Sequence, residues 1–138
     1  MSLEDIDRTA LVNYRIEKAR STFEDALFIA GARRWNMAVN RLYYALYHAV
    51  SALLLSDGIP TRTHKGVMVQ MNLNYVKTGI LSKEDGVLLS QLYSLRQEAD
   101  YEDFIEVTEE QVGDFIPKVR CLLDKVIGVA QNKLDSTP

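Results

Sequence analysis

Apolar and polar residues along this chain follow the spacing of amphipathic helices, and no run alternates with the two-residue period of a strand. The sequence therefore predicts an all-α fold of about five helices. The first two are expected at about residues 3–30 and 34–56. Gly31 is expected to end the first helix in a left-handed conformation, and Asp57 with Gly58 to end the second. Only a few residues around Gly31 connect these two helices, so the sequence predicts that they form an antiparallel hairpin.

Turn and capping signals place the third and fourth helices. The third is expected to run to just before Gly79, with Thr61 or Thr63 capping the free amides at its start. The fourth is expected to begin after Ser82 and to reach about Ala99.

The fifth predicted helix carries two conflicting signals. Thr108 followed three residues later by Gln111 is a capping box, which indicates a helix start. Pro117 lacks a backbone donor, and its ring collides with the preceding turn of a helix. The sequence therefore predicts a helix that is kinked at Pro117 or that starts later than its cap.

Composition indicates one globular domain. The chain has 138 residues, 47% hydrophobic and 25% charged, and no repeat or Gly/Ser-rich linker divides it. Residues 1–133 are therefore predicted to form a single antiparallel up-and-down bundle, with 134–138 as a disordered tail. Cys121 is the only cysteine, which excludes an internal disulfide and favours the cytoplasm. The most apolar stretch, residues 42–55, is too short to span a membrane.

Charge is segregated along the chain, although the net charge is only −3. Basic residues and both histidines gather between residues 31 and 65, whereas acidic residues dominate between 82 and 114. Solvated helix faces would explain this segregation without any binding role. Nothing in the sequence indicates DNA specificity. The acidic stretch lacks the glycine and ligand spacing of a calcium loop, so neither a metal nor another cofactor is predicted.

The second predicted helix separates a core face from a face that carries chemistry. At about 100° per residue, its core face contains Val39, Tyr43, Leu46, Val50 and Leu53. Arg41 and His48 are seven positions apart, so they share a line on the opposite side. Ala45 and Ala52 lie beside that line, and their small side chains would let another surface approach closely. The sequence therefore predicts a groove along this line.

An arginine and a histidine on one line suit chemistry on a phosphate. A neutral imidazole can accept a proton from a hydroxyl, and a guanidinium can donate several hydrogen bonds to a phosphate that gains charge. With His48 as acid or base and Arg41 as phosphate stabiliser, a ribose 2′-hydroxyl could attack the adjacent phosphorus without a metal. A chance pair that is salt-bridged or solvated is the alternative explanation.

Further basic and aromatic residues are candidates for binding a nucleotide or its phosphates: Arg34, Tyr44, His64, Lys65 and Arg96. His64 and Lys65 fall at a helix start, which favours anions, although an exposed capped turn is the alternative. Tyr44 is the best-placed tyrosine for stacking on a base. For Arg96, an ion pair with the aspartate four residues further on is the stronger interpretation.

Three stretches of the chain resemble landmarks of the HEPN family, and they occur in the same order. Residues 40–50 resemble its signature helix, in which four to six residues separate an arginine from a histidine; here six do. Residues 63–66 and 95–101 resemble two further landmarks. The resemblance implies a short helical bundle that dimerises, so that two Arg/His helices face each other across a cleft.

The resemblance implies two alternative functions. Some HEPN proteins resemble RNA-cleaving toxins, whereas others look like partners of minimal nucleotidyltransferases. Leu42 stands where the ribonuclease branch often has a polar residue, and Val50 where the branch silenced by nucleotide transfer has a tyrosine. We therefore expect a homodimer that binds a nucleotide or RNA in its Arg/His cleft as partner of a minimal nucleotidyltransferase. Metal-independent RNA cleavage by His48 and Arg41 is the alternative.

Overall fold

The computed structural model describes residues 2–101 and 105–136. In chain order the elements are α1 (Leu3–Gly31), α2 (Trp35–Ser56), α3 (His64–Met71), the π-helical turn η1 (Asn72–Val76), α4 (Lys83–Tyr101) and α5 (Glu109–Asp135). Within those residues there is no strand, which confirms the all-α fold of five helices. None of the described helices is both long and apolar enough to cross a bilayer.

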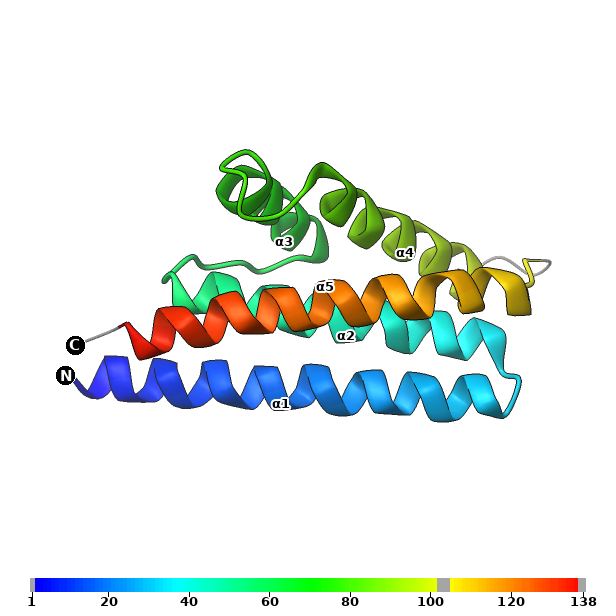
Figure 1. Cartoon of the computed structure of the whole chain (residues 1–138), viewed down its shortest axis with the longest axis horizontal. Coiled ribbons are helices and arrows are strands. Elements are labelled where there is room, and N and C mark those ends of the chain that lie inside the picture. Colours follow the sequence, from blue (N-terminus) through cyan, green and yellow to red (C-terminus); the bar gives the residue numbers. More distant parts are fainter. Residues whose placement is uncertain (1, 102–104, 137–138) are drawn as a thin grey trace.

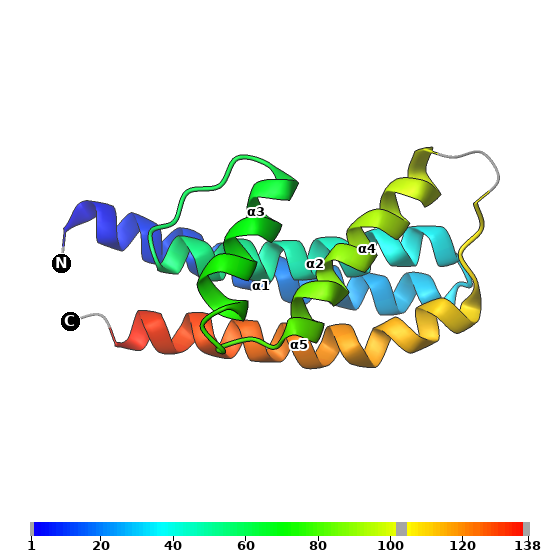
Figure 2. The same cartoon turned by 90° about the horizontal axis from the view of Figure 1, so that it is seen from above.

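Three long helices lie side by side, and two shorter ones cross them. α1, α2 and α5 share the long axis of the molecule (Figure 1), and the predicted hairpin of α1 and α2 is present. α3 and α4 lie over α2 and cross it obliquely, so they depart from a simple up-and-down arrangement (Figure 2). α2 is the central element, because it contacts each of the other four helices.

α2 is enclosed on almost every side. All five residues of its predicted core face are fully buried. Ala45 and Ala52, which were expected to border an open groove, are fully buried too. That expectation is wrong, because the surface that covers these alanines belongs to the chain itself. Arg41 and His48 keep only a partly exposed edge of the helix.

The buried residues of α1 and α2 share one spacing. In α1 they recur at alternating intervals of four and three, as Val12, Ile16, Ala19, Phe23 and Ala26. In α2 the same intervals join Ala38, Leu42, Ala45, Ala49 and Ala52. This average of 3.5 residues is the spacing of helices that pack side by side along their length. Alanines allow the two backbones to approach closely, and the fit fixes the register of the hairpin.

Most predicted helix ends are confirmed, with one exception in the hairpin and another in the third helix, where α3 ends at Met71 and a π-helical turn continues to Val76. Thr63 and Ser82 cap α3 and α4, and Gly58 has the left-handed φ of 71° that ends α2. Gly31, however, stays within α1, and Arg33 takes the left-handed conformation instead, with φ 62°. The turn therefore closes two residues later than the glycine indicated.

α5 begins at its capping box on Thr108 and continues through Pro117, so the predicted later start is wrong. The proline deprives the Gly113 carbonyl of its helical donor, but both residues are exposed and water can replace that donor. α5 also includes Leu134 and Asp135, which the sequence assigned to a tail. The single domain predicted for residues 1–133 stays a prediction.

Enlarging a buried alanine tests the packing of α2. Ala52→Leu replaces a methyl with an isobutyl group at a fully buried position, so we expect the free energy of unfolding to fall by about 1–3 kcal/mol. Ala10→Leu makes the same change at an exposed position of α1 and should alter it by less than about 0.5 kcal/mol. Urea denaturation measures both, and equal stability of the two variants would contradict the packing described.

Candidate functional site

Arg41, Tyr44 and His48 form a row along the partly exposed edge of α2. The Tyr44 ring lies 5.2 Å from the Arg41 guanidinium carbon and 6.0 Å from the His48 ring, both measured to its centroid. One helical turn separates each neighbour from the next, which is why the sequence spacing brings them together. The two ends of the row are the arginine and histidine that the spacing placed on one line. We call these three residues the α2 row.

The Arg41 guanidinium is bound at the end of the row away from His48. Its Nε and Nη2 donate to Asn40 Oδ1 at 3.0 and 2.7 Å. Asn40 Nδ2 in turn donates to Asp100 Oδ2 at 3.3 Å. For one phosphate to contact both Arg41 and His48, as the sequence suggested, the guanidinium must leave Asn40. Among the described residues, Arg41 has no carboxylate partner that would hold it there.

Arg96 supports the α2 row from α4. Its side chain is only 7% exposed, and its guanidinium carbon lies 5.1–5.6 Å from the rings of Tyr43, Tyr44 and Tyr93. Nη1 donates to the Tyr44 hydroxyl at 3.4 Å and pairs with Asp100 at 3.7 Å, which confirms the predicted ion pair. Burial keeps Arg96 beneath the tyrosines, so it positions Tyr44 rather than meeting a ligand first.

His64, at the first position of α3, lies close to the same tyrosines, with its ring centroid 5.7 Å from that of Tyr43 and 5.8 Å from that of Tyr44. Its ring stacks on Tyr47 at 4.5 Å, and the Tyr47 ring is 5.7 Å from that of His48. Its Nδ1 is 2.6 Å from the Tyr43 hydroxyl. Burial raises the pKa of Tyr43, so this hydroxyl stays protonated and donates to Nδ1. Burial and the charge of Arg96 lower the pKa of His64, and its neutral ring carries the proton on Nε2.

His48 is held neutral by its surroundings. Burial lowers its pKa most, and the charges of Lys18, Arg41 and Arg15 add to that effect, so its pKa falls from 6.5 to about 4. Arg15 also donates from Nη1 to the Ser51 carbonyl, 3.5 Å away across the hairpin. The imidazole can therefore accept a proton or a hydrogen bond at neutral pH.

Arg15 and Lys18 of α1 are site residues that the sequence reasoning missed. A signal for them was present, because the alternating spacing of buried residues in α1 shows which of its faces meets α2. Both residues adjoin that stripe in sequence. Only the packing of the hairpin brings them to His48, and a wheel drawn for α2 alone cannot include them.

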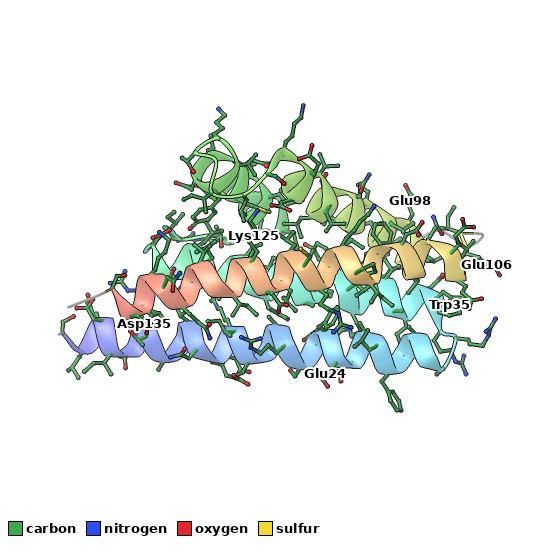
Figure 3. The ribbon with its side chains drawn as sticks, in the orientation of Figure 1. Glu24, Trp35, Glu98, Glu106, Lys125 and Asp135 are labelled. Atoms are coloured by element: carbon green, nitrogen blue, oxygen red, sulfur yellow. The ribbon has the colours of Figure 1, made fainter. Side chains whose placement is uncertain are left out.

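Arg34 and Lys65, two predicted phosphate ligands, are not brought to the α2 row. Arg34 is the exposed residue before α2, where it shares a surface with Trp35 and Glu106 at one end of the bundle (Figure 3). Lys65 is exposed in the first turn of α3. Among the described residues, no hydrogen bond, ion pair or ring contact joins either side chain to the row.

A groove of about 510 Å³ opens at the Arg41 end of the row, lined by Ile29, Asn36, Met37, Asn40, Arg41 and Asp100. Its walls come from α1, α2 and α4. Within the described part of the chain, no three His, Cys, Asp or Glu side chains lie close enough together to hold a metal ion. The α2 row and the side chains around it offer guanidinium groups, neutral imidazoles and aromatic rings.

Comparison with known proteins gives consistent results over most of the chain. A family model described as the HEPN domain matches residues 12–130. A UPF0332 protein of Thermotoga maritima is 37% identical over 120 residues, which cover 87% of this chain and 91% of the relative. A protein of Methanocaldococcus jannaschii named "Putative toxin" is 32% identical over 110 residues, 80% of this chain and 75% of the relative. A second protein of that name and organism is 30% identical over 111 residues, 80% and 82% of the two chains.

The low pKa of His48 makes stability depend on pH. The folded protein keeps His48 neutral down to about pH 4, whereas the unfolded chain protonates it near pH 6.5. Since the unfolded state binds more protons between these values, the free energy of unfolding should fall as the pH drops through that window. His48→Gln cannot titrate and should reduce this fall. Urea denaturation across the window measures it, and identical pH profiles for the two proteins would contradict the assignment.

Proposed function

The chain belongs to the HEPN domain family, and on that basis we propose that it binds RNA or a nucleotide through phosphate at the α2 row. The cluster of cations around His48 carries this proposal. Arg41, Arg15 and Lys18 all act on the imidazole, and none of them pairs with a carboxylate in the described residues. Like charges held at one edge repel each other, and a bound phosphate relieves that repulsion.

A bound phosphate also changes the state of His48. Its negative charge offsets the three cations that disfavour a proton on the imidazole, so the pKa of His48 rises from about 4 toward its ordinary value. The ring thus accepts a hydrogen bond in the empty site and can hold a proton in the occupied one. Tyr44, between Arg41 and His48, offers a ring face on which a base can stack.

We further propose that the chain works as a homodimer and as partner of a minimal nucleotidyltransferase. Family membership supports both proposals. The alanine-lined face no longer supports the dimer, because Ala45 and Ala52 are buried within the chain. A second copy would have to cover the α2 row itself, so that each copy adds its cations to one cleft.

Removing either end of the α2 row should weaken RNA binding. Arg41→Ala removes a guanidinium that can donate charge-assisted hydrogen bonds, so the Kd for a short single-stranded RNA should rise about tenfold or more. His48→Ala should weaken binding less when affinity is measured well above pH 6.5, because there the imidazole is largely neutral even at its ordinary pKa, whereas the guanidinium stays charged. Arg20→Ala removes an equal charge from an exposed position of α1 and serves as the control. Fluorescence anisotropy gives the three constants, and an Arg41→Ala value equal to that of the control would refute the site.

A second candidate function is RNA cleavage without a metal ion. The neutral imidazole of His48 and the relatives named "Putative toxin" favour it. The ribose 2′-oxygen would form a bond to the adjacent phosphorus as the bond from phosphorus to the 5′-oxygen breaks. His48 would accept the 2′-hydroxyl proton, the 5′-oxygen would take up a proton, and the product would be a 2′,3′-cyclic phosphate. Arg41 would stabilise the added negative charge.

Cleavage can be separated from binding with a chelator. In the presence of EDTA, the wild type should cut single-stranded RNA to cyclic-phosphate ends, and His48→Ala should abolish the reaction. Arg41→Ala should lower the rate by about 10²–10³-fold, since it removes a donor to the charged transition state. Product ends are read by mass spectrometry. RNA that stays intact with the wild type, alone and with a co-purified partner, would rule this function out.

A further inference from the structure

Arg15 and Lys18 lie outside the motif formed by Arg41 and His48, yet they share its edge of the hairpin. Arg15 reaches across to the Ser51 carbonyl at 3.5 Å. Since α1 and α2 run antiparallel, three residues forward along α1 are level with three residues back along α2. Lys18 therefore lies level with His48. Both charges act on the imidazole, which is consistent with this register.

Within the residues that the structure describes, Arg15 and Lys18 have no carboxylate partner. The ion pairs of the described chain use other cations, namely Arg8, Arg33, Arg96, Lys125 and Lys133. Arg15 is partly buried, and its bond to Ser51 restricts the guanidinium before any ligand arrives. Lys18 is exposed, with its ammonium 5.9 Å from the Tyr14 ring centroid. One fixed and one adaptable donor thus stand together beside His48.

Arg15 and Arg41 are too far apart to share one phosphate. Arg15 is fixed at the level of Ser51, and Arg41 lies ten positions earlier in α2. Ten helical residues rise about 15 Å, and Arg41 is bound to Asn40, further still from Ser51. A ligand with several phosphates can engage both ends, whereas a mononucleotide can engage only one.

We propose that Arg15 and Lys18 form a second phosphate subsite beside Arg41 and His48, and that the chain therefore prefers a strand with several phosphates to a mononucleotide. The subsite rests on the proposed function, because it extends the same edge. The second subsite also favours RNA over a nucleotide, the two ligands of the proposed function. A strand of RNA occupies both subsites, whereas a single nucleotide occupies the α2 row alone.

The test compares two probes on one set of variants. The probes are adenosine monophosphate and a short single-stranded RNA whose riboses carry 2′-O-methyl groups, which block cleavage. Arg15→Gln/Lys18→Gln should raise the Kd for the RNA about tenfold or more. It should raise the Kd for the mononucleotide far less, because a phosphate at the α2 row meets Arg15 and Lys18 only through their longer-range charge. The slope of log K against log salt should become less steep by about 0.7 for each phosphate that the variant no longer neutralises. Arg20→Gln is the matched control for Lys18→Gln, since both positions are exposed in α1.

The possible results distinguish failure of the second subsite from failure of the proposed function. Equal losses of affinity for both probes would overturn the second subsite, and so would an effect no larger than that of Arg20→Gln. A wild type that binds neither probe would refute the proposed function itself and the subsite with it. Lys18→Gln alone keeps the test valid if the double variant unfolds, because Lys18 is exposed. Its own expected effect is a smaller rise in Kd that is larger for the RNA than for the mononucleotide.

Discussion

Close packing of α1 against α2 through alanines determines how the charged side chains of these two helices lie around His48. The shared spacing of four and three residues fixes the register of the hairpin, and that register sets Arg15 against Ser51. It also buries the alanines beside the α2 row, so the row keeps one narrow open edge. With α5, α3 and α4 covering the rest of α2, the polar side chains have nowhere else to reach solvent.

The tyrosines beneath that edge stabilise the buried cation of Arg96. A guanidinium taken out of water loses strong hydration, and Arg96 regains part of it from three ring faces, the Tyr44 hydroxyl and Asp100. One hydrogen-bonding atom, Nε, stays without a partner in the described chain. The buried Arg96 guanidinium holds Tyr44 and Tyr43 in fixed positions. Through these tyrosines it also positions the rings of His48 and His64.

Local signals in the sequence predicted local features well. Caps at Thr63, Ser82 and Thr108 were found because each depends on residues three apart. Arg41 and His48 share a line because they are seven positions apart, about two turns of one helix. The burial of Ala45 could not be predicted from its own helix, because it depends on which neighbour approaches. The same holds for the cations of α1, which reach His48 only through the hairpin. The α2 row could therefore be predicted, because it depends on spacing within one helix. The cations of α1 could not, because they depend on how two helices pack.

The hydrogen bonds between Arg41 and Asn40 affect which ligands can bind at the α2 row. In the empty site the guanidinium donates twice to a neutral amide oxygen. A phosphate oxygen is the stronger acceptor, because it carries a negative charge that attracts the guanidinium and can accept two parallel bonds from it, as in bidentate Arg–phosphate pairs. A phosphate can therefore displace Asn40, whereas a neutral ligand offers no advantage over it. Since Asn40 also binds Asp100, whose carboxylate pairs with Arg96, release of Arg41 leaves the support of Tyr44 intact. The site can thus exchange an internal partner for an anion without disturbing the tyrosines on which the row is built.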